Sequence, residues 1–581
     1  MLQKNSENNE NISKNKYFIP TVLMIIYIFI AIIISVAVRF SMTTEDTNVS
    51  ISNNSGEEAF FSGKYDAAIS EYTSLQEKDE WPFWNLKISE IYSIQGDYKK
   101  SNELIQKVYD SRNRIIDTVN VNTEEFSEKD RELTNYIVFN SFMNGEYKKA
   151  LEYGEFFLKS YPNDINLLKT MFAVYLANDD KENAEYIIDT FSSKDNDDEA
   201  LITAAKMNLL IGNYDNGLNL LESAYKLDEN NIDIFNAIES AAKYNKSNMI
   251  NSINKLKNKD KNNLIYELFL AEVYSLDSSD ISKCEDIIGE LKNDFSNNVN
   301  YLFIEMRMYI EQNEEKKAEK VLDEIIDSNE DTFIGEYAQG LKLYYEGKYD
   351  DALKHAKKSV VLNKDYSKTY SSLIPSILLE QKKSSEEEPY LRTALYKEPY
   401  NFDTIIKIAE YYKDVLRDSS KALYYYSLAT KINPDNAEAY YKMALIQYNN
   451  QRIDEAITLL KKSISLNSNE SKYYRTLGSI YLEENKDEEG ITQIRKAYNI
   501  DNNDIAALNN AAYYYIYVEN DIDRAMANIK AAYEGIKETT TNSEKEIITD
   551  NYNRIKVIYD SSRGNSSSRD NGVVSEVKLI Y

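Results

Sequence analysis

Apolar residues recur at helical spacing along most of the chain, in pairs of short segments separated by polar breaks. The stretch 437–470 contains one such pair, with segments at 437–449 and 453–465. Small or apolar residues stand three or four positions apart in each segment, at Tyr440, Met443, Ala444 and Tyr448 and at Ala456, Leu459, Leu460 and Ser463. This spacing is typical of amphipathic helices. The polar break at 449–451 is short, so we expect two antiparallel helices that lie side by side.

The same pattern returns after 34 residues. In 471–504 the matching positions are Leu477, Gly478, Tyr481, Gly490, Ala497 and Ile500. Pro399 and Pro434 stand 35 residues apart, at the boundaries between pairs. A helix–turn–helix of this length, with small residues where its helices touch, resembles the tetratricopeptide repeat (TPR) family. The resemblance implies an all-α fold, a TPR-like α-solenoid whose helix pairs stack into a right-handed superhelix.

Two markers trace the repeat along the chain. The first is Gly-x-Tyr, which begins at Gly63, Gly96, Gly145, Gly212 and Gly347. Glycine suits the turn between two helices because helix ends often need a left-handed residue. The second marker is the position three residues after that Tyr, where the second helix of a pair packs on the first. Following it gives Ala68, Ser101, Ala150, Ala184, Gly217, Ile250, Cys284, Ala318, Ala352, Glu387, Ala422, Ala456, Gly490 and Ala525. We therefore predict about fourteen units over residues 55–537.

Some positions interrupt this register. Ile250 and Glu387 are too large for the small-residue position, so their units are the least regular. One step of 49 residues, where the others are 33 to 35, indicates an insertion between Ser111 and Leu133. We expect this 111–133 insertion to be a loop or a helix extension, and insertions in repeat arrays sometimes bind partners. Pro375 lies inside a first helix and should kink it, because proline has no backbone N–H.

The array is predicted to end in a capping helix at 541–560. Ser543 to Glu546 resembles a capping box, and apolar residues continue after it at helical spacing. A solenoid needs such a helix because its open end exposes apolar surface. Residues 561–581 are expected to form a flexible tail. The apolar stretch 573–581 leaves an alternative open, in which a tethered segment docks in a groove or adds to a partner's sheet.

The other end of the chain carries a hydrophobic run. Residues 17–38 are 22 residues without a charge, and as a helix they would span about 33 Å, enough for a hydrocarbon core of about 30 Å. We expect a transmembrane helix between a cytoplasmic tail at 1–16 and a linker at 39–54. Three lysines precede the run and Arg39 follows it, so the positive-inside rule places the repeats on the extracytoplasmic side of the cell membrane. Cleavage of 17–38 as a signal peptide stays an alternative, although the run is longer than usual.

Composition and charge narrow the function. The formal charge of −28 disfavours nucleic acid, whose phosphates need a basic surface. The sequence has one cysteine, Cys284, and one histidine, His355. It therefore offers no intrachain disulfide, no cysteine metal cluster and no two-histidine zinc motif. It has no glycine-rich phosphate loop, and the repeats leave no room for a separate catalytic domain. We therefore predict no catalytic residue, metal, cofactor or small-molecule substrate.

A binding surface remains as the functional feature. Stacked helix pairs form a superhelix with a concave groove, and the resemblance implies that the first helix of each unit lines it. Near the C-terminal end the matching positions are Tyr441, Tyr448, Lys472, Arg475, Asn509, Tyr513 and Tyr517. Tyrosine combines a broad apolar face with a polar tip, and the two basic residues could pair with a carboxylate.

The sequence thus favours a membrane-anchored scaffold that binds a protein or peptide partner in this groove. The lipid bilayer would be contacted through 17–38. The resemblance implies a role in assembly of an envelope, secretion or motility complex. Two alternatives stay open, a passive spacer or oligomerising element and an enzyme that uses carboxylates.

Overall fold

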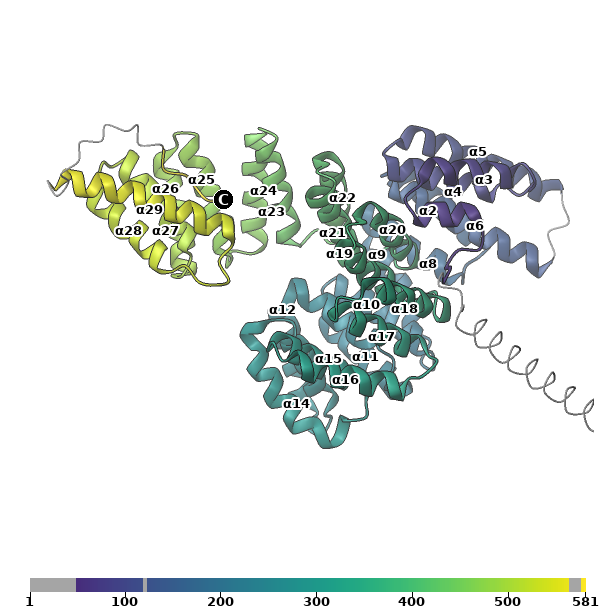
Figure 1. Ribbon diagram of the computed structural model, residues 1–581. Helices are drawn as coiled ribbons and strands as arrows, with labels where there is room; N and C mark the ends of the chain where they lie inside the picture. Colours follow the sequence, from purple (N-terminus) through teal and green to yellow (C-terminus); the bar gives the residue numbers. More distant parts are fainter. Residues whose placement is uncertain (1–48, 119–122, 564–575) are drawn as a thin grey trace, which may run out of the picture.

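The computed structural model describes residues 49–118, 123–563 and 576–581, and every regular element in these ranges is a helix (Figure 1). The predicted all-α fold is confirmed. None of the helices in the described ranges is long and apolar enough to cross a membrane. The predicted span 17–38, the N-terminal tail 1–16 and most of the linker 39–54 lie outside those ranges.

The helices follow one another in pairs along the chain. The first group is α2 (Ser55–Phe61), α3 (Tyr65–Gln76), α4 (Phe83–Gln95), α5 (Tyr98–Thr118), α6 (Glu124–Met143), α7 (Tyr147–Leu158), α8 (Ile165–Ala177), α9 (Lys181–Ser192), α10 (Asp198–Leu210) and α11 (Tyr214–Leu227). The second is α12 (Asp233–Lys259), α13 (Ile265–Tyr274), η1 (Ser278–Asp280), α14 (Ile281–Phe295), α15 (Val299–Glu311), α16 (Glu315–Ser328), α17 (Phe333–Tyr345), α18 (Tyr349–Leu362), η2 (Thr369–Leu373), α19 (Ile374–Glu380), η3 (Ser384–Glu386) and α20 (Glu387–Lys397). The third is α21 (Phe402–Glu410), η4 (Tyr411–Val415), α22 (Ser419–Ile432), α23 (Ala437–Asn449), α24 (Ile453–Leu466), α25 (Ser471–Glu483), α26 (Asp487–Ile500), α27 (Ile505–Tyr517), α28 (Ile522–Glu534) and α29 (Asn542–Ser562).

The first helices of several units begin with the same kind of cap. An Asp or Asn side chain accepts a hydrogen bond from the backbone N–H three residues on, which satisfies a donor that the helix itself leaves unpaired. These caps are Asp164, Asp197, Asn298, Asn436 and Asp504. A polar residue at these five unit boundaries therefore fixes where the next pair starts.

The turn inside most pairs also repeats, with or without glycine. The glycines of the Gly-x-Tyr marker all have positive φ. Five positions before the small residue of other units, the same conformation is taken by Asp179, Asn313, Lys382, Arg417, Gln451, Asn485 and Asn520. Asn245 breaks the rule, with φ −144° and ψ 45°, and α12 runs through this kink where other units have a turn. The Gly-x-Tyr marker therefore traces only part of a turn that is more widespread.

The small-residue positions lie where the helices of a pair touch. Each of the fourteen except Ile250 is buried in the structure. Helices α25 and α26 approach closely, since a Cβ added to Gly478 would lie 2.8 Å from the carbonyl oxygen of Gly490. A side chain at either position would push the helices apart, because packed interiors leave no spare room.

In the residues that the structure describes, the 111–133 insertion extends two helices. It lengthens α5 to 21 residues and α6 to 20, whereas most neighbouring helices have 12 or 13. A buried ion pair joins the two extensions, with Arg112 Nη2 at 2.5 Å from Asp130 Oδ2. The Tyr161 hydroxyl donates to the same carboxylate at 2.5 Å. These contacts give the insertion a packing role in the N-terminal units.

Pro375 disturbs its helix as expected. A π-helical turn, η2, stands directly before it, and the regular helix α19 resumes at Ile374. Proline removes one helical donor, so carbonyl groups in the preceding turn need other partners. The Ser371 carbonyl accepts a hydrogen bond from Lys407 Nζ at 3.2 Å, from the next unit.

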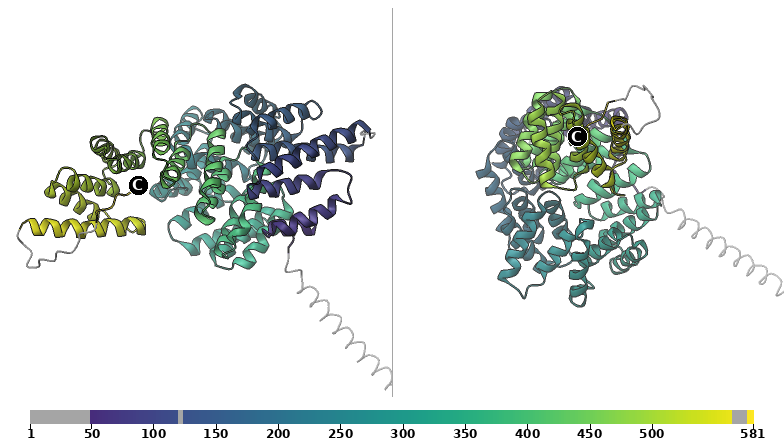
Figure 2. Two further views of the ribbon diagram at one scale, coloured as in Figure 1. Left: turned by 90° about the horizontal axis from the view of Figure 1, so that it is seen from above. Right: turned by 90° about the vertical axis from the view of Figure 1, so that its left-hand side faces the viewer.

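The chain before residue 436 closes on itself. Two hydrophobic cores join distant segments, one within 201–394 and one that combines 86–207 with 391–446. Within the second core, the ring of Tyr396 stacks on Tyr136 with centroids 4.1 Å apart, and the Tyr424 hydroxyl donates to the Met143 carbonyl at 2.5 Å. Helices α23 to α29 extend to one side of this closed part (Figures 1 and 2). Ala439 and Ile446 of α23 belong to the second core, and the rest of α23–α29 has hydrophobic cores of its own. We refer to α23–α29 as the arm.

The arm ends in the expected capping helix, which begins slightly earlier than its sequence signal suggested. The capping box consists of Thr541 and Glu544, each side chain hydrogen-bonding with the backbone N–H of the other. The box expected at Ser543 to Glu546 is thus replaced by one that starts two residues earlier, because Thr541 takes the extended conformation that an N-cap requires. Helix α29 then covers the last repeat through Ile548 and Ile555, both fully buried.

Candidate functional site

The last six residues of the chain lie against the arm. Residues 576–581, which we call the tail segment, contain no helix or strand. Their end is close to α25 in Figure 1. The side chains that receive them come from α23, α25, α27 and α29, and we call this set the tail-binding surface. Three of these are first helices of their units and the fourth is the capping helix.

Asparagine side chains hold the backbone of the tail segment. Asn551 accepts from the Lys578 N–H at 2.9 Å and donates to the Lys578 carbonyl at 2.7 Å. In the same way, Asn510 accepts from the Ile580 N–H at 2.8 Å and donates to the Ile580 carbonyl at 2.6 Å. Asn509 adds a donor to the Lys578 carbonyl at 2.9 Å. Alternate residues of the segment thus present their backbone to one side, as residues of a β-strand do.

The three asparagines are fully buried and bonded to one another. Asn551 Nδ2 donates to Asn509 Oδ1 at 2.8 Å, and Asn509 Nδ2 donates to Asn510 Oδ1 at 3.0 Å. All three have zero relative exposure. Buried amides are costly unless they are hydrogen-bonded. The backbone of the tail segment supplies partners that complete this network.

Further contacts fix both ends of the segment. The Val577 N–H donates to the Tyr517 hydroxyl at 2.8 Å, and the Ser479 hydroxyl donates to the Ile580 carbonyl at 3.1 Å. The ring of Tyr581 packs on Tyr448 with centroids 4.8 Å apart. Both of these tyrosine hydroxyls donate to the carboxylate of Glu483. Burial, followed by the nearby Glu483 carboxylate, raises the pKa of Tyr448 to about 12.

Apolar side chains of the tail segment enter the cores of the arm. Val577, Leu579 and Ile580 are buried, whereas Lys578 is exposed. We expected residues 561–581 to be a flexible tail, with docking as the alternative. The tail segment is docked, because three of its side chains are apolar and its backbone meets matched amides. Residues 564–575 lie outside the described ranges.

The residues predicted from sequence divide into two groups. Tyr448, Asn509 and Tyr517 contact the tail segment directly, and Tyr513 packs on Tyr517 with ring centroids 4.9 Å apart. The other three are engaged within the arm: Tyr441 is buried against Tyr473, Lys472 pairs with Glu438 at 2.8 Å, and Arg475 pairs with Asp504 at 2.8 Å. The two basic residues are therefore already paired with carboxylates of the chain.

Sequence reasoning missed Ser479, Asn510, Asn551 and Arg554, of which Arg554 donates to the Glu576 carbonyl. Asn510 follows the predicted Asn509, and two adjacent asparagines inside an otherwise apolar helix were a detectable signal. Nothing in the sequence indicates that Asn551, on the capping helix, lies beside them.

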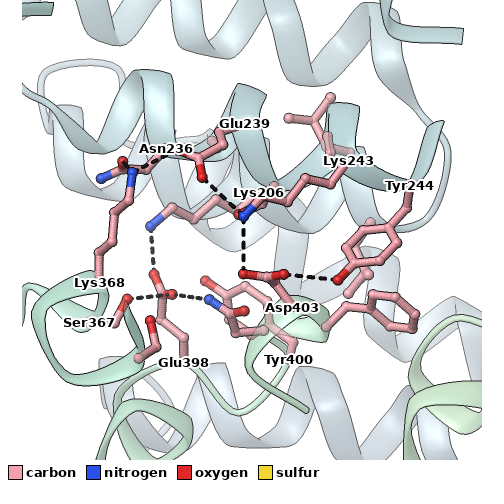
Figure 3. Close-up of a pocket in the computed structure, with 18 of the residues that line it drawn as sticks. Lys206, Asn236, Glu239, Lys243, Tyr244, Ser367, Lys368, Glu398, Tyr400 and Asp403 are labelled. Atoms are coloured by element: carbon pink, nitrogen blue, oxygen red, sulfur yellow. Dashed lines mark hydrogen bonds and ion pairs between the residues drawn. The ribbon is translucent and has the colours of Figure 1, made fainter. Parts of the chain in front are cut away.

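A second candidate site is a charged pocket inside the closed part of the chain (Figure 3). It lies between α10, α12 and the segment from η2 to α21. Lys206 Nζ lies 2.5 Å from Glu398 and 3.6 Å from Asp233, while Lys368 Nζ lies 2.6 Å from Glu239. Three more charged residues line the pocket: Lys243, Asp403 and Lys407. Each charged side chain that lines the pocket in the described chain forms an ion pair with another side chain of the pocket. These ion pairs connect segments that are distant in the sequence, and we call this set of paired residues the clasp.

The electrostatics of the clasp agree with this interpretation. Burial would raise the pKa of Glu398, but the ammonium group of Lys206 outweighs it and holds that pKa at about 2. For Lys206, burial acts to lower the pKa, and the carboxylates of Asp233 and Glu398 raise it overall. The pocket walls therefore carry fixed opposite charges that neutralise each other.

Two other buried acids bear on the enzyme alternative. Burial raises the pKa values of Glu387 and Glu388 to about 7. Neither residue lines the charged pocket. Successive residues on a helix point about 100° apart, so these carboxyls do not form a facing pair. Glu388 instead hydrogen-bonds with the Tyr412 hydroxyl, which also donates to the Ile94 carbonyl at 3.3 Å.

The remaining reactive side chains have structural environments. His355 is half-buried and its Nδ1 lies 2.5 Å from Glu336 Oε2, whereas the thiol of Cys284 is fully buried with a pKa raised to about 12 by burial. In the part of the chain that the structure describes, no group of three or more His, Cys, Asp or Glu residues is arranged to hold a metal ion.

Comparisons with known proteins agree with the repeat geometry. The tetratricopeptide repeat family model matches residues 417–480. A DnaJ homolog subfamily C member 7 homolog from Dictyostelium discoideum is 24% identical over 207 residues, which are 33% of this chain and 37% of that protein. The chain thus aligns with little more than a third of that relative's length.

Solved structures that match this chain include the APC/C hetero-tetramer Cut9–Hcn1 and pilF of Pseudomonas aeruginosa. The match to the first has a TM-score of 0.32 at 12% sequence identity, and it covers 78% of this chain and 94% of that chain. The match to the second has a TM-score of 0.30 at 13% sequence identity, and it covers 39% of this chain and 98% of that chain.

A solenoid of this kind is consistent with a scaffold for protein–protein interaction. The family match covers α22 of the closed part and the start of the arm, and the same register of turns and small residues continues on both sides of it. Residues 417–480 therefore resemble tetratricopeptide repeats in sequence, and the helix pairs on either side of them repeat the same turns.

Proposed function

We propose that this protein is a membrane-anchored scaffold that binds a partner protein by holding an extended segment of it against the tail-binding surface. The observation that carries the proposal is the docked tail segment, whose backbone is bound by Asn509, Asn510 and Asn551. Hydrogen bonds to backbone groups are available to any peptide, and side-chain pockets then add specificity.

The anchor in this proposal is the uncharged run at 17–38. It is long enough for a bilayer, and the lysines before it favour a cytoplasmic N-terminus. The repeats would then stand on the extracytoplasmic side of the cell membrane. There, in keeping with membrane-tethered TPR proteins that this chain resembles, it would assist assembly of an envelope, secretion or motility complex.

Site-directed photo-crosslinking in the protein's own membranes tests partner binding. A benzophenone amino acid replaces Tyr448 or Tyr517 in the full-length chain, and the control replaces Tyr186, which is 68% exposed on α9 and outside the arm. We expect both arm positions, but not the control, to crosslink one continuous segment of a partner, identified by mass spectrometry. Equal crosslinking at Tyr186, or scattered adducts with no common segment, would contradict the proposal.

Cysteine labelling in intact cells tests the orientation. Cys284 is fully buried, so the folded chain offers little background. We expect the exposed Asn262→Cys variant to react with a membrane-impermeant maleimide before the cells are opened, and Ser6→Cys in the N-terminal tail only afterwards. The reverse order would place the repeats in the cytoplasm.

A further inference from the structure

We infer that the tail segment is a built-in competitor for the tail-binding surface, so that a partner peptide binds only when residues 576–581 leave. This inference rests on the proposed function and adds the chemistry of the partner and the means of its control. The occupant seen in the structure defines what the surface accepts, and the partner is expected to carry the same features.

The first argument is the specificity of the surface for a peptide backbone. Asn510 and Asn551 each bind the N–H and the carbonyl of one residue, and these two residues are separated by one position. A buried asparagine that only fills a core needs no such spacing. Paired donors and acceptors at every second residue match an extended peptide and do not match a helix, whose backbone groups bond internally.

The second argument is the pattern of side chains. The surface buries Val577, Leu579 and Ile580 and leaves Lys578 in solvent. It then receives the ring of Tyr581 on Tyr448, with Glu483 accepting from the Tyr581 hydroxyl. A matching partner is an extended protein segment with aliphatic residues at these positions, a freely variable residue between the first two, and a tyrosine at the end.

The third argument is that the arm does not need the tail segment for its own connectivity. The helices of the arm pack on one another through buried residues of their own, among them Ala456, Leu460 and Ile529. The segment adds side chains to these cores from outside and pairs with no strand in the described chain. Its attachment to α29 makes its binding intramolecular, and a short linker gives such a ligand an effective concentration of about millimolar. A partner on another molecule must therefore bind more tightly than the tail segment or be present at a higher concentration, unless the tail segment is removed.

A labelled peptide tests the competition directly. The probe is fluorescein-labelled Glu-Val-Lys-Leu-Ile-Tyr, the sequence of residues 576–581. Its binding is measured by fluorescence anisotropy to the full-length chain in mild detergent, to the same chain lacking residues 576–581, and to the Val577→Asp, Leu579→Asp variant, which keeps the length but disfavours burial of the segment. We expect both altered chains to bind the probe at least about tenfold more tightly than the unaltered chain.

Variants of the tail-binding surface show whether the probe binds there. In the chain that lacks 576–581, Asn510→Ala should weaken probe binding at least about tenfold, because two backbone hydrogen bonds are lost. Asn469→Ala, which changes an exposed asparagine of the same arm, should have no effect. Circular dichroism melts of each variant report whether the arm remains folded.

The outcomes separate this inference from the proposed function. Equal, tight binding by the unaltered and altered chains would overturn the competition and leave a peptide-binding surface. No binding by the folded altered chains would overturn both. If the unaltered chain is a dimer that dissociates when 576–581 is deleted, the segment binds in a second copy, and the intramolecular inference is wrong.

Discussion

Single buried residues in this solenoid depart from the small and apolar rule, and Glu388 is the clearest example. It lies on α20 beside Glu387, which occupies a position that most other units fill with Ala, Gly, Ser or Cys. The pKa of the Glu388 carboxyl is raised to about 7 because burial disfavours the charged form. The folded state therefore binds this proton between about pH 4.5 and 7, whereas the unfolded chain releases it.

A pH-dependent stability follows from that difference. Since the folded state holds more protons than the unfolded state in this range, stability should fall as pH rises from about 4.5 through 7. Glu388→Gln cannot ionise and can still hydrogen-bond with Tyr412. We expect it to match the unaltered protein at pH 5 and to be more stable at pH 8, by up to about 3 kcal/mol.

Thermal and urea denaturation at the two pH values measure this gain. Glu155→Gln, at an exposed position of α7, is the matched control and should show no comparable change between pH 5 and 8. If Glu388→Gln is equally stable relative to the unaltered protein at both pH values, the carboxyl does not carry the proton as described.

Within a helix pair, the small-residue position decides how closely the two helices approach. Ala456 on α24 is fully buried against α23. Ala456→Phe would insert a ring where the interior has no space, and overpacking of this kind typically costs about 1–3 kcal/mol. We expect a lower melting temperature for the arm, whereas Glu455→Phe on the exposed side of the same helix should leave the melt nearly unchanged. An unchanged melt for Ala456→Phe would mean that the helices of this pair do not touch there.

The elements that could be predicted from sequence are those set by local pattern. Helix pairs, their turns and the capping helix follow from spacing, caps and small residues, all within about 34 residues of one another. Tyr448 and Tyr517 could also be predicted, because they occupy the same first-helix position, eight residues before the small residue of their units, and Asn509 lies on the same helix as Tyr517. Tyr441 lies on the same helix as Tyr448, yet Tyr473 of the next unit packs against it, which depends on how two units stack.

Contacts between distant segments could not be predicted in this way. The tail segment meets Asn510 from 70 positions further along the chain, and Lys206 meets Glu398 across 192. Such pairs depend on the cumulative rotation of the solenoid, and small differences between units, such as the kink at Asn245 or the π-turn before Pro375, change that rotation. A single sequence contains no local signal for the sum of these changes.

For the molecule as a whole, the charged pocket connects segments of the closed part that are far apart in the sequence, with α10 and α12 on one side and residues 367–407 on the other. Lys206 of α10 pairs with Glu398 and Asp233, and both carboxylates are largely buried. Removing one partner of a buried pair leaves an uncompensated charge, which typically costs about 3–5 kcal/mol. We therefore expect Lys206→Met to lower the stability of the closed part by about that amount and to loosen the contact between α10 and the segment around Glu398.

Denaturation and small-angle X-ray scattering measure these two effects, as a lower melting temperature and a larger radius of gyration. Lys255→Met is the control, since its pair with Asp215 is largely exposed and surface pairs contribute at most about 1 kcal/mol. Adding Glu398→Gln to Lys206→Met should restore part of the loss, because the uncompensated carboxylate is then neutral. If the single variant behaves like the Lys255→Met control, the closed shape is held by the hydrophobic cores alone, and the ion pairs of the pocket are free to serve another role.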